Sequence, residues 1–346
     1  MSESACRMRI GDRLVGTGLP TFIIAEVGMN HNGDLDLAKE LIMAAGTTGV
    51  DAVKFQTFKT ELYFDRSFPD YDVRVKHELP YEWHSELYAI AHELGLEFFS
   101  TPFDEESVDF LNALGVPCFK IASSDCNNFP FIRYVARKQK PILLSTGYSH
   151  LAQVQGAVET ICEEGNEQIV ILHCVASYPL EPEDLNMQAM ETLRCAFNRL
   201  VGFSDHSQDS LLAPIMATTL GGCVYERHFT IDRTLPGYDH GMSATPEDMA
   251  RVVRTIRSAE AAMGDGLKRP TQAEHVRLAG ARRSLHWKGD YEKGTPITED
   301  MFLTLRPGDG IRTDWVGTLV GKSLRRNVTA RARVRFEDLD LEQFTA

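Results

Sequence analysis

The sequence has no long hydrophobic run, no paired-cysteine motif and no excess of positive charge. No apolar stretch approaches the roughly 20 residues that span a bilayer, and the N-terminus lacks the apolar centre of a signal peptide. The seven cysteines are scattered, without a C-x-x-C motif. Several lie in apolar stretches, where Cys acts as a small hydrophobic residue. These features predict no membrane partner and indicate a reducing cytoplasm.

The net charge of -13 argues against nucleic acid or an anionic membrane as a partner. It leaves room for a small anionic substrate, because a few lysines converging on a pocket set the local field. The glycine-rich nucleotide loops G-x-x-x-x-G-K and G-x-G-x-x-G do not occur. What is present is a chain of 346 residues, 43% hydrophobic and 25% charged, which is the composition of an ordinary globular protein.

Short apolar runs alternate with helix-like segments along most of the chain. Each run leads into a polar or small-residue loop, whereas the segments between them carry apolar residues at i, i+3 and i+4. This alternation is typical of a parallel sheet, and eight repeats predict a closed (β/α)8, or TIM, barrel. A doubly wound open sheet is the alternative. The eight predicted strands are residues 22–28, 52–58, 97–103, 118–124, 141–147, 169–175, 201–206 and 224–230.

The pattern changes after residue 266, where short β-like pieces with turn residues take over. We expect a barrel over residues 1–266, a linker over 267–282 and a small β-rich domain over 283–346. A weak internal echo relates PITEDM (296–301) to VRFEDL (334–339). A domain of about 60 residues is marginally stable alone, so we expect it to pack on its own barrel or on a neighbouring subunit.

In a (β/α)8 barrel the active site lies at the carboxyl ends of the strands. Lys54 and Lys120 lie there inside apolar strands, and Lys is almost never buried without a partner. One interpretation is an internal salt bridge to Glu26 or Glu226. We favour a site for phosphate or carboxylate, because hydroxyl-bearing residues end the neighbouring strands. Further polar residues at these ends are Gln56, Thr101, Ser123, Asp125, Ser145, Tyr178 and Ser204.

Two histidines follow successive strands in similar settings, since GFSDH ends in His206 and VYERH ends in His228. Neutral imidazole is the commonest side-chain metal ligand. Two imidazoles with open positions suit a divalent ion that acts as a Lewis acid, whereas a closed zinc site would need four protein ligands. General acid–base catalysis without a metal is the alternative. His173, inside IVILHCV, is predicted to be a hydrogen-bonded core residue.

The chain resembles the sialic acid (N-acetylneuraminate) synthase family over nearly its whole length. The resemblance rests on IIAEVGMNHNGD, DAVKFQTF, FFSTPFD, KIASSDCNNFP, LLSTG, LHCVASYPLEPEDLNM, GFSDHS and ERHFT, in this order. RPGDGI and GK near the C-terminus resemble the family's antifreeze-like (SAF) domain. The resemblance implies condensation of phosphoenolpyruvate with an N-acylated hexosamine, first of all N-acetylmannosamine, to a nine-carbon 2-keto acid sugar and phosphate.

The resemblance also implies roles for single residues. His206 and His228 would hold a divalent ion, Mn²⁺ or otherwise Mg²⁺ or Co²⁺. The chain would act as a homodimer, with Arg306 of one antifreeze-like domain reaching the partner's barrel. Phosphoenolpyruvate would bind to Lys54, Thr101, Lys120, Ser123, Ser145 and Ser204, and the sugar to Glu26, Gln56, Tyr178 and Asp239.

We expect Lys54 and Lys120 to act in catalysis by neutralising the anion and fixing its orientation. A carboxylate, Glu26 or Asp125, is expected to handle the water that adds during the reaction.

Departures from the family pattern lie on the sugar side. The loop after the fourth strand reads ASSD (122–125) where bacterial neuraminate synthases commonly carry GSGE, and VASYP (175–179) lacks an Asn found in some members. Alternatives are therefore a legionaminate, pseudaminate or other nonulosonate synthase, or a synthase for a 6-phosphorylated acceptor. An alternative of another class is a non-catalytic carbohydrate-binding protein.

Overall fold

The structure, a computed structural model, describes residues 7–177, 180–207 and 211–340. The chain divides into two compact units, residues 1–264 and 265–346. The first unit contains an eight-stranded parallel sheet in the order β5-β4-β3-β10-β9-β8-β7-β6. Because β5 and β6 also lie in contact, the sheet forms a nearly closed barrel, which confirms the predicted eight-stranded barrel. The strands are β3 (Phe22–Gly28), β4 (Ala52–Thr57), β5 (Glu97–Pro102), β6 (Phe119–Ile121), β7 (Ile142–Ser145), β8 (Ile169–Cys174), β9 (Leu200–Asp205) and β10 (Val224–His228).

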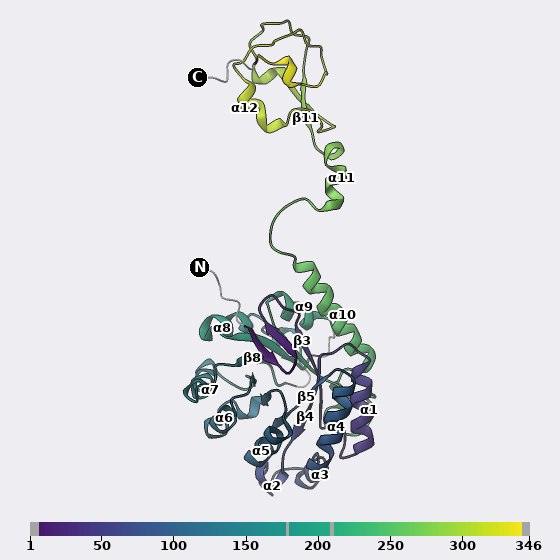
Figure 1. Cartoon of the computed structure of the whole chain (residues 1–346), viewed down its shortest axis with the longest axis vertical. Coiled ribbons are helices and arrows are strands. Elements are labelled where there is room, and N and C mark those ends of the chain that lie inside the picture. Colours follow the sequence, from purple (N-terminus) through teal and green to yellow (C-terminus); the bar gives the residue numbers. More distant parts are fainter. Residues whose placement is uncertain (1–6, 178–179, 208–210, 341–346) are drawn as a thin grey trace. The chain divides into compact units, whose positions relative to one another are not determined.

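Helices surround these strands and cover the outer face of the barrel (Figure 1). The strands are therefore buried on both faces, which explains why they read as continuous apolar runs. Helix ends follow local signals: Asp104 caps α5, and Gly115 ends it in the left-handed conformation. The helices are α1 (Leu35–Gly46), α2 (Thr60–Tyr63), α3 (Tyr71–Lys76), α4 (Tyr81–Glu93), α5 (Glu105–Leu114), α6 (Phe129–Ala136), α7 (Leu151–Glu163), α8 (Ala189–Phe197), α9 (Leu212–Thr219) and α10 (Pro246–Met263).

A β-hairpin that the sequence analysis did not predict precedes the barrel. Strands β1 (Arg7–Ile10) and β2 (Arg13–Gly16) pair antiparallel, and Met8, Ile10 and Val15 are buried in the core of the barrel. The backbone N–H of Asp12 donates to Glu97, the first residue of β5, at 2.8 Å. The hairpin therefore lies at the amino ends of the strands and leaves the carboxyl ends for a site.

The second unit has a small core of its own around Trp287. It contains helices α11 (Gln272–Ala281) and α12 (Val316–Leu319) and the antiparallel strands β11 (Ser284–Trp287) and β12 (Phe302–Leu305). Helix α11 lies within the predicted linker and buries none of its residues. The internal echo corresponds to two similar 3-10 turns, Glu299–Met301 and Phe336–Asp338.

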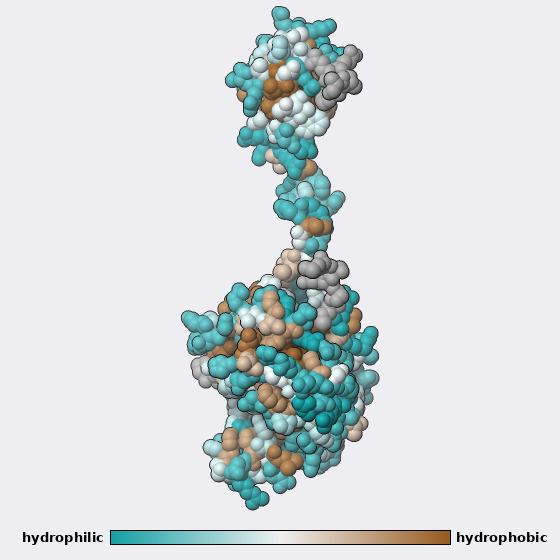
Figure 2. Space-filling model, turned by 90° about the vertical axis from the view of Figure 1, so that its left-hand side faces the viewer, coloured by the Kyte–Doolittle hydropathy of each residue, from teal (hydrophilic) through white to brown (hydrophobic). Residues whose placement is uncertain are grey.

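The surface of both units is mostly hydrophilic, with separate hydrophobic patches, on the face that Figure 2 shows. In the described part of the chain, no helix combines the length and the apolar character that crossing a membrane requires. The cysteines of the described residues, from Cys118 to Cys223, are free thiols.

Candidate active site

The carboxyl ends of the barrel strands bring the two predicted lysines into one buried polar network. Lys54 on β4 is 2% exposed, and its Nζ lies 2.7 Å from Glu26 Oε2 and donates to Thr101 Oγ1 at 2.9 Å. Lys120 on β6 is 4% exposed. Glu226 Oε1 on β10 lies between the two ammonium groups, 3.7 Å from Lys54 Nζ and 3.9 Å from Lys120 Nζ. Five strands thus contribute to the network.

The internal salt bridges that the sequence left as the other interpretation are therefore formed. A phosphate or carboxylate that bound here would compete with Glu26 and Glu226 for the same ammonium groups. The sequence suggested Glu226 only as a possible salt-bridge partner, yet Glu226 lies at the centre of the network. Its position two residues before His228 on one strand was the available signal, because alternate residues share a face.

Burial and mutual charge set the proton affinities of the network. Burial raises the pKa of Glu26 to about 7, against the opposing effect of Lys54. Burial alone would also raise the pKa of Glu226, but the charges of Lys120 and Lys54 outweigh burial and lower it. Burial lowers the pKa of Lys120. Glu26 is thus the carboxyl group of the pair that exchanges a proton near neutral pH.

Two further predicted contacts join the network from neighbouring strands. Gln56 Nε2 donates to Glu26 Oε1 at 3.2 Å, and Ser204 Oγ donates to Glu226 Oε1 at 3.2 Å. Each of these polar groups therefore contacts one of the two buried carboxylates and faces the interior of the barrel.

The two predicted serines, Ser123 after β6 and Ser145 at the end of β7, lie on the β6–β7 side of the site. Ser123 Oγ accepts from the N–H of Gly147 at 3.0 Å, and a Cβ at Gly147 would lie only 2.7 Å from that oxygen. Glycine is therefore required for this close approach. Ser145 Oγ is buried without a hydrogen-bond partner among the described residues. A buried hydroxyl is costly to leave unpaired, so Ser145 has capacity to bind a ligand oxygen.

His206 and His228 lie side by side at the ends of β9 and β10. Their ring centroids are 5.4 Å apart, and the ring planes make an angle of 35°. His206 Nδ1 lies 3.1 Å from the carbonyl oxygen of Val175 and 3.6 Å from Cys174 Sγ. A backbone partner of this kind orients the ring of a metal-binding histidine so that Nε2 points the opposite way.

The proton affinities of the two imidazoles differ. Burial lowers the pKa of His228 to about 4, so this ring is neutral at pH 7, and its buried Nδ1 has no hydrogen-bond partner among the described residues. Burial alone would lower the pKa of His206, but contact with Cys174 outweighs burial and raises it. Two adjacent imidazoles, one with an unpaired buried nitrogen, fit a divalent ion that takes further ligands from water and substrate. No cluster of three or more His, Cys, Asp or Glu side chains among the described residues could hold a metal.

Asp125 and His173 form hydrogen bonds with residues that do not belong to the network. The Asp125 carboxylate accepts from Ser124 Oγ and Asn128 Nδ2, both at 3.1 Å and both within its own loop, and burial raises its pKa. His173 Nε2 lies 2.8 Å from the carbonyl oxygen of Leu185. The prediction that His173 is a hydrogen-bonded core residue is therefore confirmed.

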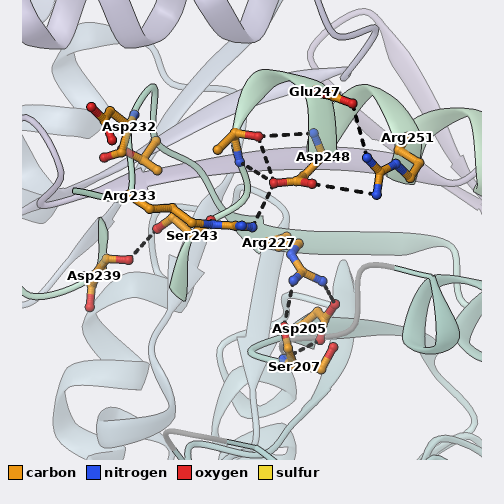
Figure 3. Close-up of polar contacts among 12 residues, drawn as sticks. Asp205, Ser207, Arg227, Asp232, Arg233, Asp239, Ser243, Glu247, Asp248 and Arg251 are labelled. Carbon is orange, nitrogen blue, oxygen red and sulfur yellow. Dashed lines mark hydrogen bonds and ion pairs between the residues drawn. The ribbon is translucent and has the colours of Figure 1, made fainter. Parts of the chain in front are cut away.

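The other predicted site residues come from loops and from the second unit. Asp239 lies in the loop between β10 and α10, close enough for its charge to raise the pKa of His228 against the stronger effect of burial. Its backbone oxygen accepts from Ser243 Oγ at 2.6 Å (Figure 3). Arg306 is exposed directly after β12. Tyr178 lies outside the described residues.

Comparison with known proteins identifies the family. The model of the NeuB family matches residues 41–268. This chain belongs to the NeuB family. It is 40% identical to the N,N'-diacetyllegionaminic acid synthase of Legionella pneumophila, over 94% of this chain and 96% of that protein. It is 34% identical to the human N-acetylneuraminate-9-phosphate synthase, over 90% of both chains.

A solved structure supports the same assignment for this NeuB chain. The N-acetylneuraminic acid (sialic acid) synthetase from Leptospira borgpetersenii superimposes with a TM-score of 0.75 at 31% identity, over 79% of this chain and 95% of that chain. The resemblance to the sialic acid synthase family inferred from the sequence is thus confirmed, and the relatives named here are nonulosonate synthases.

A cavity of about 540 Å³ in this NeuB chain is lined by residues that follow β7 and β8 and by residues of α7 and α8. Cys174, whose Sγ lies 3.6 Å from His206 Nδ1, forms part of its wall. Its lining residues include Thr146, Tyr148, Cys174, Ser177, Asn186 and Gln188.

Proposed function

We propose that this protein condenses phosphoenolpyruvate with an N-acylated hexosamine, giving a nine-carbon 2-keto acid sugar and phosphate. The observation that carries the proposal is the pair of buried ammonium groups beside two adjacent imidazoles. Phosphoenolpyruvate presents a phosphate and a carboxylate on one small molecule, and Lys54 and Lys120 offer one cation to each. The synthase names of the relatives support the same reaction class.

In this proposal the network binds and orients the donor. Lys54 and Lys120 neutralise phosphoenolpyruvate and fix the face that its enol carbon presents to the aldehyde carbon of the open-chain sugar. His206 and His228 would hold a divalent ion, Mn²⁺ or alternatively Mg²⁺ or Co²⁺, which would supply a Lewis acid for the aldehyde. Hydroxyl groups that would hold the donor are those of Thr101, Ser123, Ser145 and Ser204.

A carboxyl group is needed for the water that adds to carbon 2 before the bond to phosphate breaks. Asp125 already accepts two hydrogen bonds within its own loop. Glu26 lies in the network itself and has a pKa of about 7, which suits a group that accepts and returns a proton at neutral pH. The position of Glu26 in the network and its pKa therefore support Glu26, rather than Asp125, for this role.

The sugar-side residues and the comparisons support a proposal for the acceptor. Glu26, Gln56, Tyr178 and Asp239 are its proposed contacts. The higher identity to the legionaminic acid synthase, 40% against 34% for the human enzyme, favours a 2,4-diacetamido sugar over N-acetylmannosamine. A 6-phosphorylated acceptor would need a cation for its phosphate. Arg74 is the candidate, because its guanidinium lies 4.0 Å above the ring of Tyr238, the residue before Asp239.

The second unit is proposed to be an antifreeze-like domain that covers the barrel of a partner chain in a homodimer. Basic residues outnumber acidic ones in residues 265–346, whereas acidic residues predominate in 1–264. Opposite charge on the two units supports such docking. Arg306 would then reach the partner's site. The proposed compartment is the cytoplasm, in keeping with free thiols.

Phosphate release from phosphoenolpyruvate tests the proposal. The full-length protein is assayed with Mn²⁺ and, in parallel, a 2,4-diacetamido hexose, N-acetylmannosamine and N-acetylmannosamine 6-phosphate. We expect phosphate and an equimolar 2-keto acid with one acceptor, and no turnover after removal of the metal or in His206→Ala. Binding of sugars without phosphate release from any of them would instead support a carbohydrate-binding protein.

A further inference from the structure

A buried ion pair joins the two strands that end at the imidazoles. Arg227 Nη1 on β10 lies 2.6 Å from Asp205 Oδ2 on β9, and the two side chains are 2% and 0% exposed. The two residues are also partners in the β9–β10 register. Asp205 directly precedes His206, and Arg227 directly precedes His228, so the pair lies one residue before both imidazoles.

The guanidinium contacts the backbone on the other side of His206 as well. Arg227 Nη2 donates to the carbonyl oxygen of Ser207 at 2.7 Å, and the N–H of Ser207 donates to Asp205 Oδ1 at 2.8 Å. The hydroxyl of Tyr225 donates to Asp205 Oδ2. Figure 3 shows Arg227 reaching both Asp205 and Ser207. The residues before and after His206 are thus tied to a single side chain.

This pair faces away from the site. Successive side chains alternate across a strand, and Ser204 and Glu226 bond to each other on the inner face of the barrel at 3.2 Å. Asp205 and Arg227, which follow them, therefore lie on the outer face, between the sheet and the helices. Neither charged group is in a position to touch a substrate.

A buried ion pair at this position needs a reason other than stability. Desolvation makes such pairs weak contributors to stability, and apolar residues of similar volume often replace them without loss. Their best-attested role is to specify register. A slip of one residue between β9 and β10 would turn His206 or His228 away from the inner face.

We propose that Asp205 and Arg227 are positioning residues for the imidazole pair. By holding the backbone on both sides of His206 against the residue before His228, they set the separation and the direction of the two rings. The inference rests on the proposed function, because it assumes that the imidazoles bind a divalent ion. Mutation of residues that orient metal ligands typically lowers the metal affinity by about 10- to 100-fold.

The test measures Mn²⁺ binding to the full-length protein in the absence of substrates, by electron paramagnetic resonance. Arg227→Met and Asp205→Asn are expected to weaken Mn²⁺ binding by about tenfold or more. Calorimetric titration with phosphoenolpyruvate is expected to give the wild-type affinity. Arg227→Lys, which keeps the charge but loses the forked geometry, is expected to recover part of the Mn²⁺ affinity.

A matched control uses an ion pair at the other end of the barrel. Arg257 Nη2 lies 3.1 Å from Asp51 Oδ2, just before β4. Arg257→Met is expected to lower the thermal stability and to leave Mn²⁺ binding unchanged. If Mn²⁺ and phosphoenolpyruvate affinities fall together in the Arg227 variants, the pair only stabilises the fold and the inference is wrong.

His206→Ala separates failure of this inference from failure of the proposed function. If His206→Ala binds Mn²⁺ as wild type does, or wild type binds none, the metal site itself is wrong. If His206→Ala loses Mn²⁺ while Arg227→Met binds it normally, only the positioning role is wrong. Should Arg227→Met or Asp205→Asn fail to fold, the Mn²⁺ affinity of Arg227→Lys decides.

Discussion

Lys120 shows how a single buried charge can be prepared for a ligand. It is 4% exposed, its pKa is lowered by burial, and its carboxylate partner Glu226 lies 3.9 Å away. A carboxylate at this distance compensates the ammonium only in part. An incoming anion would therefore gain a charge pair that is already desolvated, which is a condition for tight binding.

Replacing Lys120 with Met is expected to raise the KM for phosphoenolpyruvate by about 30-fold, or roughly 2 kcal/mol, because a buried charge pair is lost. The KM for the sugar should change little. Steady-state phosphate release, with each substrate varied in turn, measures both constants. Lys140→Met is the control, since Lys140 donates to the carbonyl oxygen of Val116 at 2.6 Å, away from the site. A rise in the sugar KM alone would place phosphoenolpyruvate elsewhere.

His84 is a residue whose neutral form is required by the fold. It is buried on α4, where Nε2 lies 2.9 Å from Thr57 Oγ1 and Nδ1 lies 3.0 Å from the carbonyl oxygen of Pro80. Burial lowers its pKa to about 4 from an ordinary value of 6.5. Between these pH values the unfolded chain binds a proton that the folded chain does not, so stability falls as the pH falls.

We therefore expect His84 to account for a loss of about 2 kcal/mol in unfolding free energy between pH 7 and pH 5. His84→Gln should be less stable at pH 7 but show a correspondingly flatter pH dependence. Urea unfolding followed by circular dichroism at both pH values measures the difference. His92→Gln, exposed on the same helix, should keep the wild-type slope. Equal slopes for the two variants would contradict the assignment.

At the scale of elements, the strands of the barrel were predictable and the hairpin was not. Burial on both faces imposes continuous apolar runs, so β3, β4 and β5 begin at the predicted residues. In the hairpin RMRIGDRLVG only the first of the two four-residue strands, RMRI, alternates polar and apolar residues. A pattern this short does not distinguish a strand from a loop, and the core that the hairpin covers is formed by distant segments.

Helix capping gives a prediction at the same scale. At the start of α10, which buries four residues, Thr245 Oγ1 accepts from the N–H of Asp248 at 3.3 Å and forms a capping box. Thr271 and Glu274 form the equivalent capping box on α11, which buries none of its residues. Thr245→Ala should lower the unfolding free energy of the barrel by about 1 kcal/mol. Thr271→Ala should leave it unchanged. Thermal unfolding of both variants measures this, and equal effects would contradict it.

At the scale of the whole molecule, the proposed homodimer makes a test by complementation possible. His206→Ala removes a barrel function, and Arg306→Ala removes the proposed contribution of the second unit. Mixing the two inactive variants and letting subunits exchange should restore about a quarter of the wild-type activity, because half of the symmetric dimers would be mixed and carry one complete site. Phosphate release before and after mixing measures the recovery. No recovery would mean that Arg306 does not serve the partner's barrel.

The sequence by itself determined the repeating strands and helices and the set of polar residues at the strand ends. It could do so because burial of a strand on both faces makes each ionisable residue in it conspicuous. The prediction that Lys54 and Lys120 lie together depended only on the closure of the barrel.

Only the tertiary structure decided which of these residues are partners. Asp205 adjoins His206 in the sequence, but the strand turns it to the opposite face, where it binds Arg227. Lys54 on β4 is paired with Glu26 on the neighbouring strand β3, and Glu226 lies between the two lysines. Distances across a barrel depend on register and closure, which spacing along the chain does not encode. The polar residues at the strand ends could therefore be predicted from the sequence, whereas the pairing of their side chains could not.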